Sequence, residues 1–124
     1  MRAFKTRWFH RWAASEGLID VALATAVDEM TNGLIEADLG GHVVKKRVGL
    51  PGHGKRGGAR TLVAFRRDDR AFFIYGFAKN ERANISQKEL KALKLLAATL
   101  LGYSRAGLEK AVRAGELIEV NSNG

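Results

Sequence analysis

The sequence predicts an α+β fold in which helices pack on a small antiparallel sheet. Strand-like segments cluster between residues 42 and 78, and amphipathic helical segments lie before and after them. The 124 residues are 46% hydrophobic, which fits one compact domain over residues 1–124. The predicted order of elements is β-α-α-β-β-β-α-α.

The first third of the chain predicts one strand and two helices. Residues 3–9 contain aromatic residues and a threonine, which favour a strand. Residues 9–16 are then expected to form one or two helical turns, ended by a glycine. A period near 3.6 predicts a longer amphipathic helix with an apolar stripe at Ile19, Leu23, Val27 and Met30. That helix should end at Gly33, and residues 34–41 are expected to form a loop.

The middle of the chain predicts three successive strands, at residues 42–48, 60–67 and 71–78. The glycine-rich segment 49–58 is expected to form an irregular loop, and residues 67–70 a polar turn. Strands joined this closely are most simply antiparallel neighbours. The nearly continuous apolar run in 71–78 predicts a central strand that is covered on both faces.

The last third predicts two helices, together spanning residues 86–115. Ser86 and Glu89 form an S-x-x-E capping box at the start of the first helix. Its apolar stripe comprises Leu90, Leu93, Leu96 or Ala97, and Leu100. Glycines end both helices, and the tail 116–124 either docks as an extended piece or frays.

Positive charge is concentrated in the middle segment. The net charge of the protein is +8, and residues 42–82 alone hold eleven Lys and Arg against three Asp and Glu. This concentration indicates an anionic partner, such as nucleic acid, an acidic protein or a membrane surface. The alternative is a solvated basic surface that aids solubility.

The composition also excludes several classes of protein. The absence of cysteine excludes disulfides, thiolate metal sites and a cysteine nucleophile, and it fits a cytoplasmic protein. No apolar run approaches the ~20 residues that a membrane span requires. The N-terminus lacks the uninterrupted apolar core of a secretory signal. We therefore expect a soluble cytoplasmic protein.

Three familiar kinds of site are disfavoured. Residues 49–55 match the G-x-x-x-x-G-K part of a nucleotide-binding loop, but Arg56 replaces the Ser or Thr, and a strand follows instead of a helix. A metal site is not expected, because the histidines lack ligand-like spacing: His10, His42 and His53. Asp68 and Asp69 are adjacent and fit a turn. No G-x-S-x-G nucleophile motif is present.

The basic residues on the predicted strands are the remaining candidates for chemistry. By the two-residue period of a strand, Lys45 and Arg47 share one face and Lys46 points to the other. RNA cleavage needs a base for the ribose 2′-OH, cations for the phosphate and an acid for the leaving oxygen. Clustered lysines favour a neutral, basic amine, and arginine holds two phosphate oxygens at once. These residues alone leave both phosphate binding and metal-free RNA cleavage open.

Three blocks of sequence carry a resemblance to a known family: VVKKRVGLPGHGKRGGARTLVAFR, AFFIYGFAKNERANIS and ELKALKLLA. Over roughly residues 20–120, this order resembles the RelE/ParE superfamily, and more closely the HigB-like branch of RelE toxins. The resemblance implies a RelE-like fold and a toxin of a bacterial type II toxin–antitoxin module. It further implies a ribosome-dependent, metal-independent mRNA endonuclease that needs no cofactor. The implied partners are mRNA, the ribosome and a HigA-like antitoxin with a helix-turn-helix domain.

The resemblance implies catalytic roles for basic residues of the middle segment. Arg60, in G-G-A-R, matches the family arginine that stabilises the transition state, and Lys55 matches the basic end of the preceding loop. Lys45 and Arg47 match family positions that serve as base and phosphate contacts. His53 is a further candidate, because an imidazole near neutrality in a cationic loop suits proton transfer. The alternative is that His53 is an ordinary loop residue.

Other positions are expected to bind RNA: Lys46, Arg56, Lys79 and Arg82. The chain departs from RelE proper at two points. Asn80, also expected to contact RNA, stands where RelE proper has an arginine in K-R-E-R. The C-terminal tyrosine of RelE proper has no counterpart, and its place falls near Ser86. These departures bear on the details of the mechanism more than on the family.

Two alternative functions remain open on the same sequence. One is a non-catalytic toxin of the ParE type, which inhibits DNA gyrase and would use the basic face only for binding. The other is a DNA-binding regulator that uses residues 86–114 as a helix-turn-helix. The second helix of that pair offers few cations for base readout, and nearby glutamates offset them: Arg105, Lys110 and Arg113 against Glu109 and Glu116.

Overall fold

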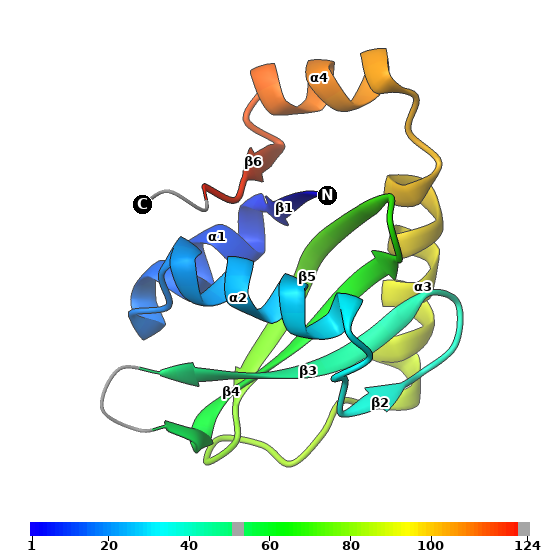
Figure 1. The fold of residues 1–124 in the computed structure, drawn as a ribbon. Helices are drawn as coiled ribbons and strands as arrows, with labels where there is room; N and C mark the ends of the chain where they lie inside the picture. The colour runs from blue at the N-terminus through cyan, green and yellow to red at the C-terminus, as the bar shows by residue number, and fades with distance from the viewer. Residues whose placement is uncertain (51–53, 122–124) are drawn as a thin grey trace.

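In a computed structural model, which describes residues 1–50 and 54–121, six strands form one sheet with helices on both faces (Figure 1). The strands are β1 (Arg2–Thr6), β2 (Ala37–Asp38), β3 (Val43–Leu50), β4 (Gly54–Arg66), β5 (Arg70–Ala78) and β6 (Leu117–Glu119). The helices are α1 (Arg7–Glu16), α2 (Asp20–Thr31), α3 (Gln87–Leu101) and α4 (Arg105–Arg113). The strand order across the sheet is β2-β3-β4-β5-β1-β6.

The predicted α+β fold is confirmed, but the sheet has six strands where four were predicted, and one pairing is parallel. The strands β3, β4 and β5 are antiparallel neighbours as expected, but β1 pairs with β5 in parallel. In that pairing Phe4 lies opposite Phe72, and their rings stack 5.3 Å apart. The parallel pair escaped prediction because more than sixty residues separate the two strands. The sheet is therefore mixed.

The first strand ends earlier than predicted. Residues 3–9 were expected to be extended, but Thr6 accepts a hydrogen bond from the backbone N–H of Phe9 and so caps α1 at Arg7. The stripe of α2 was predicted from Ile19, which is wrong for that residue. Ile19 precedes the helix as its N-cap and is exposed, whereas the other stripe residues are buried: Leu23, Val27 and Met30.

Strand pairing extends further than the middle segment suggested. Residues 49–58 were expected to form an irregular loop, yet β3 runs to Leu50 and β4 begins at Gly54, its partner. Backbone pairing with β3 outweighs the low strand propensity of these glycines. The predicted loop 34–41 likewise contains β2, which pairs with β3. The turn 67–70 is confirmed in outline, with Arg66 paired to Arg70.

The C-terminal third agrees closely with its prediction. The Ser86–Glu89 capping box is present at the start of α3. Of the two alternatives for the apolar stripe, Ala97 is buried and Leu96 is exposed. Part of the tail docks as an extended piece, because β6 pairs with β1 and buries Leu117.

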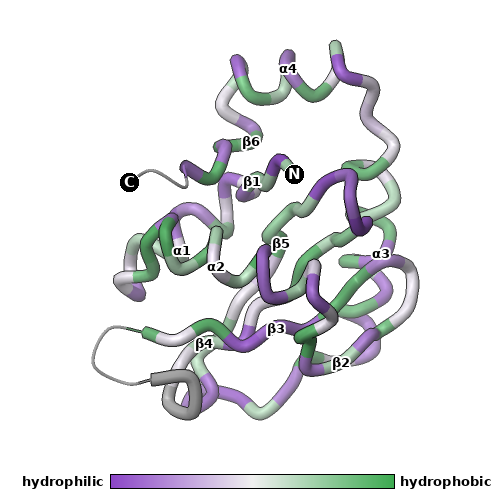
Figure 2. The backbone as a smooth tube through the Cα atoms, in the orientation of Figure 1, coloured by the Kyte–Doolittle hydropathy of each residue, from purple (hydrophilic) through white to green (hydrophobic). Residues whose placement is uncertain are grey.

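Two hydrophobic clusters cover the two faces of the sheet. One lies under α1 and α2 and includes Phe9, Leu23, Met30, Val63 and Phe73. The other lies under α3 and α4, and its largest buried members are Phe4, Leu62, Phe72, Leu100 and Leu108. Most of β5 is buried, and its successive residues Phe72 and Phe73 belong to the two different clusters, which confirms the prediction of a doubly covered central strand. Figure 2 shows the hydrophobic residues along it. Within the described ranges, no helix has both the length and the apolar character needed to cross a bilayer.

Gly76 in β5 gives a test of this packing. A Cβ added at Gly76 would overlap the ring of Trp12 from α1. We expect Gly76→Ala to lower the free energy of unfolding by about 1–3 kcal/mol, the usual range for overpacking. In a Trp12→Leu background the same substitution should cost clearly less, because the ring that it meets is gone. Urea unfolding of the four proteins measures this coupling, and equal costs in both backgrounds would contradict it.

Candidate functional site

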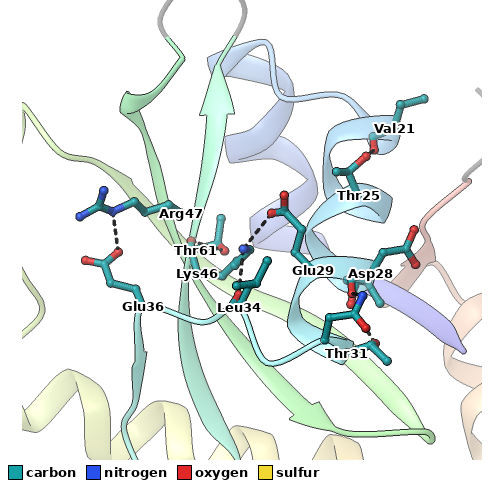
Figure 3. Close-up of polar contacts among 12 residues, drawn as sticks. Val21, Thr25, Asp28, Glu29, Thr31, Leu34, Glu36, Lys46, Arg47 and Thr61 are labelled. Carbon is teal, nitrogen blue, oxygen red and sulfur yellow. Dashed lines mark hydrogen bonds and ion pairs between the residues drawn. The ribbon is translucent and has the colours of Figure 1, made fainter.

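The alternation of side chains along β3 separates its three cations. Figure 3 shows Arg47 reaching toward Glu36 on one side of the strand, while Lys46 points the other way, toward Glu29 of α2. Lys45 lies on the Arg47 side, as its contact with Glu36 shows. The predicted two-faced arrangement of β3 is therefore present.

Glu36 lies at the centre of the cluster formed with Lys45, Arg47 and Arg60, which we call the Glu36 cluster. Its carboxylate oxygens lie 3.3 Å from Nε of Arg47, 3.0 Å from Nε of Arg60 and 3.9 Å from Nζ of Lys45. Arg47 and Arg60 are direct partners across β3 and β4. Like charges placed opposite each other in a sheet repel, so the carboxylate between them offsets a destabilising pair.

Arg60 is the most buried cation of this cluster. Its side chain is only 5% exposed, and its Nε donates a hydrogen bond to one carboxylate oxygen of Glu36 and forms an ion pair with the other. Its Nη1 is buried without a hydrogen-bond partner, alone in this respect among the side chains that the structure describes. A buried guanidinium nitrogen normally has an acceptor, because its desolvation is costly otherwise. Arg60 thus retains one buried donor whose hydrogen-bonding capacity is unused in this structure.

Lys46 has a different environment from its neighbours. Its side chain is 7% exposed, and its Nζ lies 2.8 Å from both the Leu34 carbonyl oxygen and a carboxylate oxygen of Glu29. These contacts join β3 to the end of α2 and the segment after it. The RNA-contacting role predicted for Lys46 does not fit this position, because its ammonium group faces α2 and is already hydrogen-bonded.

Arg82 forms a second acid–base cluster where α3 begins. It donates two hydrogen bonds to Glu89, a third to the Tyr75 hydroxyl, and its guanidinium lies 5.8 Å from the centre of the Phe77 ring. The hydrogen bonds from Arg82, together with those from Ser86, lower the pKa of Glu89 to about 2. The same carboxylate raises the pKa of Arg82. The predicted RNA contact at Arg82 is thus a partly exposed cation held in a fixed orientation.

The structure says less about the remaining predicted site residues. Lys79 and Asn80 are exposed in the turn after β5. Lys55 and Arg56 belong to β4, where the description covers their backbone only. His53 lies outside the described residues. The structure therefore brings Lys45, Arg47 and Arg60 together around Glu36, and the roles of all these residues stay predictions.

Two features of the site were missed from the sequence. Glu36 was assigned to a loop, and an isolated glutamate before a short strand carries no motif. The aromatic side chains of β5 were interpreted as core, although Tyr75 is only partly buried and contacts Arg82. The two-residue alternation of a strand is the signal that places Tyr75 and Phe77 on one face, with Phe77 opposite Arg60 and Tyr75 opposite Leu62. In residues 1–50 and 54–121, no three His, Asp or Glu side chains are grouped to hold a metal ion.

Comparison with known proteins finds a family match over nearly the whole chain. A family model described as the RelE toxin of the RelE/RelB toxin–antitoxin system matches residues 1–120. The matched range includes all ten helices and strands of the described structure. A search of curated proteins finds no significant match.

Replacing Lys46 and Arg47 one at a time should show which of these two neighbouring cations stabilises the fold. We expect Lys46→Met to lower the free energy of unfolding by about 1–3 kcal/mol, because it removes a buried donor from Glu29 and from the Leu34 carbonyl. Arg47→Met is the matched control; Arg47 is 44% exposed, and its loss should cost less than about 1 kcal/mol. Urea denaturation measures both, and equal costs would contradict the assignment of Lys46 to the fold.

The Glu89–Arg82 pair predicts a stability change in acid. Because the pKa of Glu89 falls from 4.5 to about 2 on folding, the stability it contributes is present above pH 4.5 and is lost between pH 4.5 and 2. Glu89→Gln keeps a side chain that suits the capping box but cannot titrate. The stability difference between wild type and Glu89→Gln should therefore shrink across that window. Unfolding measured from pH 2 to 6 tests this, with Arg82→Ala as the control in which most of the effect disappears.

Proposed function

Because the chain belongs to the RelE toxin family, and is thus a toxin of the toxin–antitoxin type with an antitoxin as its partner, we propose that it is a ribosome-dependent mRNA endonuclease that blocks translation. This is the activity that the resemblance to the HigB-like branch of RelE toxins implies. The proposed substrate is the mRNA strand exposed on the ribosome. A toxin that acts there works in the cytoplasm.

The observation that carries this proposal is the unused Nη1 of Arg60. Arg60 combines a buried guanidinium, a fixed orientation through Glu36 and one hydrogen-bond donor without an acceptor. A phosphate oxygen has the charge and the geometry that such a donor requires. Arg47 lies opposite on β3, so a phosphate bound at Arg60 would meet a second guanidinium. An RNA phosphate would compete with the Glu36 carboxylate for these two side chains.

The proposed reaction is an internal transfer at phosphorus. The ribose 2′-oxygen bonds to the neighbouring phosphorus as its proton passes to a base, and the bond from phosphorus to the 5′-oxygen breaks as that oxygen gains a proton. Arg60 and Lys55 would stabilise the charge on the phosphate oxygens, and Lys45 or Arg47 would position the backbone. A lysine of the cluster or His53 would transfer the protons. Arginine and lysine supply the positive charge that this step needs, so we propose no metal or cofactor.

Regulation follows from membership of a toxin–antitoxin pair. We propose that the antitoxin is HigA-like, with a helix-turn-helix domain of its own. An antitoxin that covers the Glu36 cluster, or that prevents entry to the ribosome from another surface, would neutralise the toxin. A gene for a small helix-turn-helix protein beside this one would support the proposal.

Substitution of Arg60 tests the function directly. We expect expression of the wild type in bacteria to arrest growth and to produce codon-phased cuts when mRNA 5′ ends are mapped. Arg60→Ala should reduce cutting by about 100-fold or more, the usual cost of losing one donor to a developing oxyanion. Arg60→Lys, which keeps the charge but not the paired donors, should retain partial activity.

The control is Arg67→Ala, which removes an exposed arginine from the β4–β5 turn and should leave cutting unchanged. Thermal unfolding of each purified protein shows whether Arg60→Ala still folds, and Arg60→Lys keeps the test decisive if it does not. Growth arrest with DNA damage signalling and without RNA cuts would replace the proposal with gyrase inhibition of the ParE type.

A further inference from the structure

A row of aromatic rings begins beside Arg60 and ends at the surface. The row consists of Phe77, Tyr75 and Trp8, and we call it the aromatic row. The centres of the Phe77 and Tyr75 rings are 6.5 Å apart, and Trp8 stacks on Tyr75 at 4.7 Å with an angle of 16° between the ring planes. Arg60 is the strand partner of Phe77 across β4 and β5. The row therefore leads outward from the Glu36 cluster.

Both inner rings of this row, Phe77 and Tyr75, contact the Arg82 guanidinium. Phe77 is buried, with the Arg82 guanidinium over its ring. The Tyr75 hydroxyl accepts a hydrogen bond from Arg82, which Glu89 fixes in turn. Trp8 thus rests against a tyrosine ring whose position is set by the start of α3.

The Trp8 side chain remains partly exposed to solvent although it has stacking partners. It is 44% exposed, whereas its neighbour Phe9 is completely buried. Trp8 belongs to neither of the two hydrophobic clusters, while Trp12, one turn later in α1, packs against the cluster under α1 and α2. The Trp12 ring also stacks on Trp8, nearly parallel to it at 6.2 Å between the ring centres, and 44% of Trp8 still stays exposed beside these two rings. The core does not account for Trp8.

We propose that Trp8 is a stacking site for an RNA base, next to a phosphate site at Arg60. Proteins that bind single-stranded nucleic acid combine cations along the backbone with aromatic rings on which bases stack. The face that carries Arg47, Arg60, Arg82 and the aromatic row has both elements. This inference rests on the proposed function only for the choice of RNA as the ligand.

The aromatic row sets the spacing between the two features. Phe77 and Tyr75 are two residues apart in β5, a distance of about 7 Å. Trp8 lies one stacked ring beyond Tyr75. A base on Trp8 and a phosphate at Arg60 would therefore belong to the same short stretch of single strand, separated by the length of the aromatic row. Every base has a stacking face, so this site should bind all four bases and prefer single strands to duplex.

Binding of a non-cleavable oligonucleotide tests the site without the ribosome. The probe is a single-stranded 2′-O-methyl hexanucleotide, and its partner is an abasic chain with the same number of phosphates. In the full-length protein carrying Trp12→Phe, Trp8 is the remaining tryptophan. Its fluorescence should be quenched by the base-bearing probe and not by the abasic chain. Trp8→Ala should weaken binding of the base-bearing probe by about 5- to 150-fold, the effect of one stacked base.

The controls distinguish stacking from loss of structure. Trp8→Phe should retain part of the affinity, and His10→Ala, an exposed change on the same helix, should retain all of it. Binding of the abasic chain should be the same in wild type and Trp8→Ala, and both should unfold at similar temperatures. Equal weakening for both probes, or no weakening for either, would overturn the proposal.

This test fails separately from the test of function. Codon-phased cuts by the wild type without base-dependent quenching would support the proposed endonuclease activity and contradict the stacking site. Base-dependent quenching without cuts in any mRNA would support the stacking site and contradict the proposed endonuclease activity.

Discussion

The register between β3 and β4 decides where the cations of this protein point. Arg47 lies opposite Arg60 and Lys46 opposite Thr61, whose hydroxyl donates a hydrogen bond to the Lys46 carbonyl. A slip of one residue would move every side chain of one strand to the other face. The register thus places one lysine beneath α2, where it joins β3 to that helix. It leaves the remaining cations of β3 with Arg60 on the face that carries the candidate site.

Two glutamates then hold the arginines of that face in place. Glu36 offsets the repulsion between Arg47 and Arg60, and Glu89 binds Arg82 through two hydrogen bonds. Cations that are already oriented lose little freedom when a ligand binds, and they stabilise developing charge without rearrangement. In this structure the carboxylates of Glu36 and Glu89 occupy positions between or beside these cations. The unused donor of Arg60 is where this arrangement differs from a fully satisfied salt-bridge network.

Both faces of the sheet bury a hydrophobic cluster, but they differ in the polar and aromatic side chains that they carry beside it. Under α1 and α2, tight contacts such as Trp12 against Gly76 and the buried Lys46–Glu29 pair contribute to stability. The other face carries the second hydrophobic cluster under α3 and α4, and also the Glu36 cluster and the aromatic row. Trp8, the outer member of this row, lies in the first turn of α1, just beyond the end of β1. A short first strand therefore gives a helix access to the candidate RNA surface.

Local signals determined much of this protein. The Ser86–Glu89 box, the turn after Arg66 and the two-residue alternation of β3 depend on neighbours within a few residues, so they could be predicted from the sequence. The same alternation placed Lys45 with Arg47, and the resemblance added Arg60. Only the tertiary structure supplied the parallel β1–β5 pair, the strand character of the glycines from Gly54 onward and the position of Glu36. These depend on backbone pairing and charge contacts between distant segments, which no local pattern encodes.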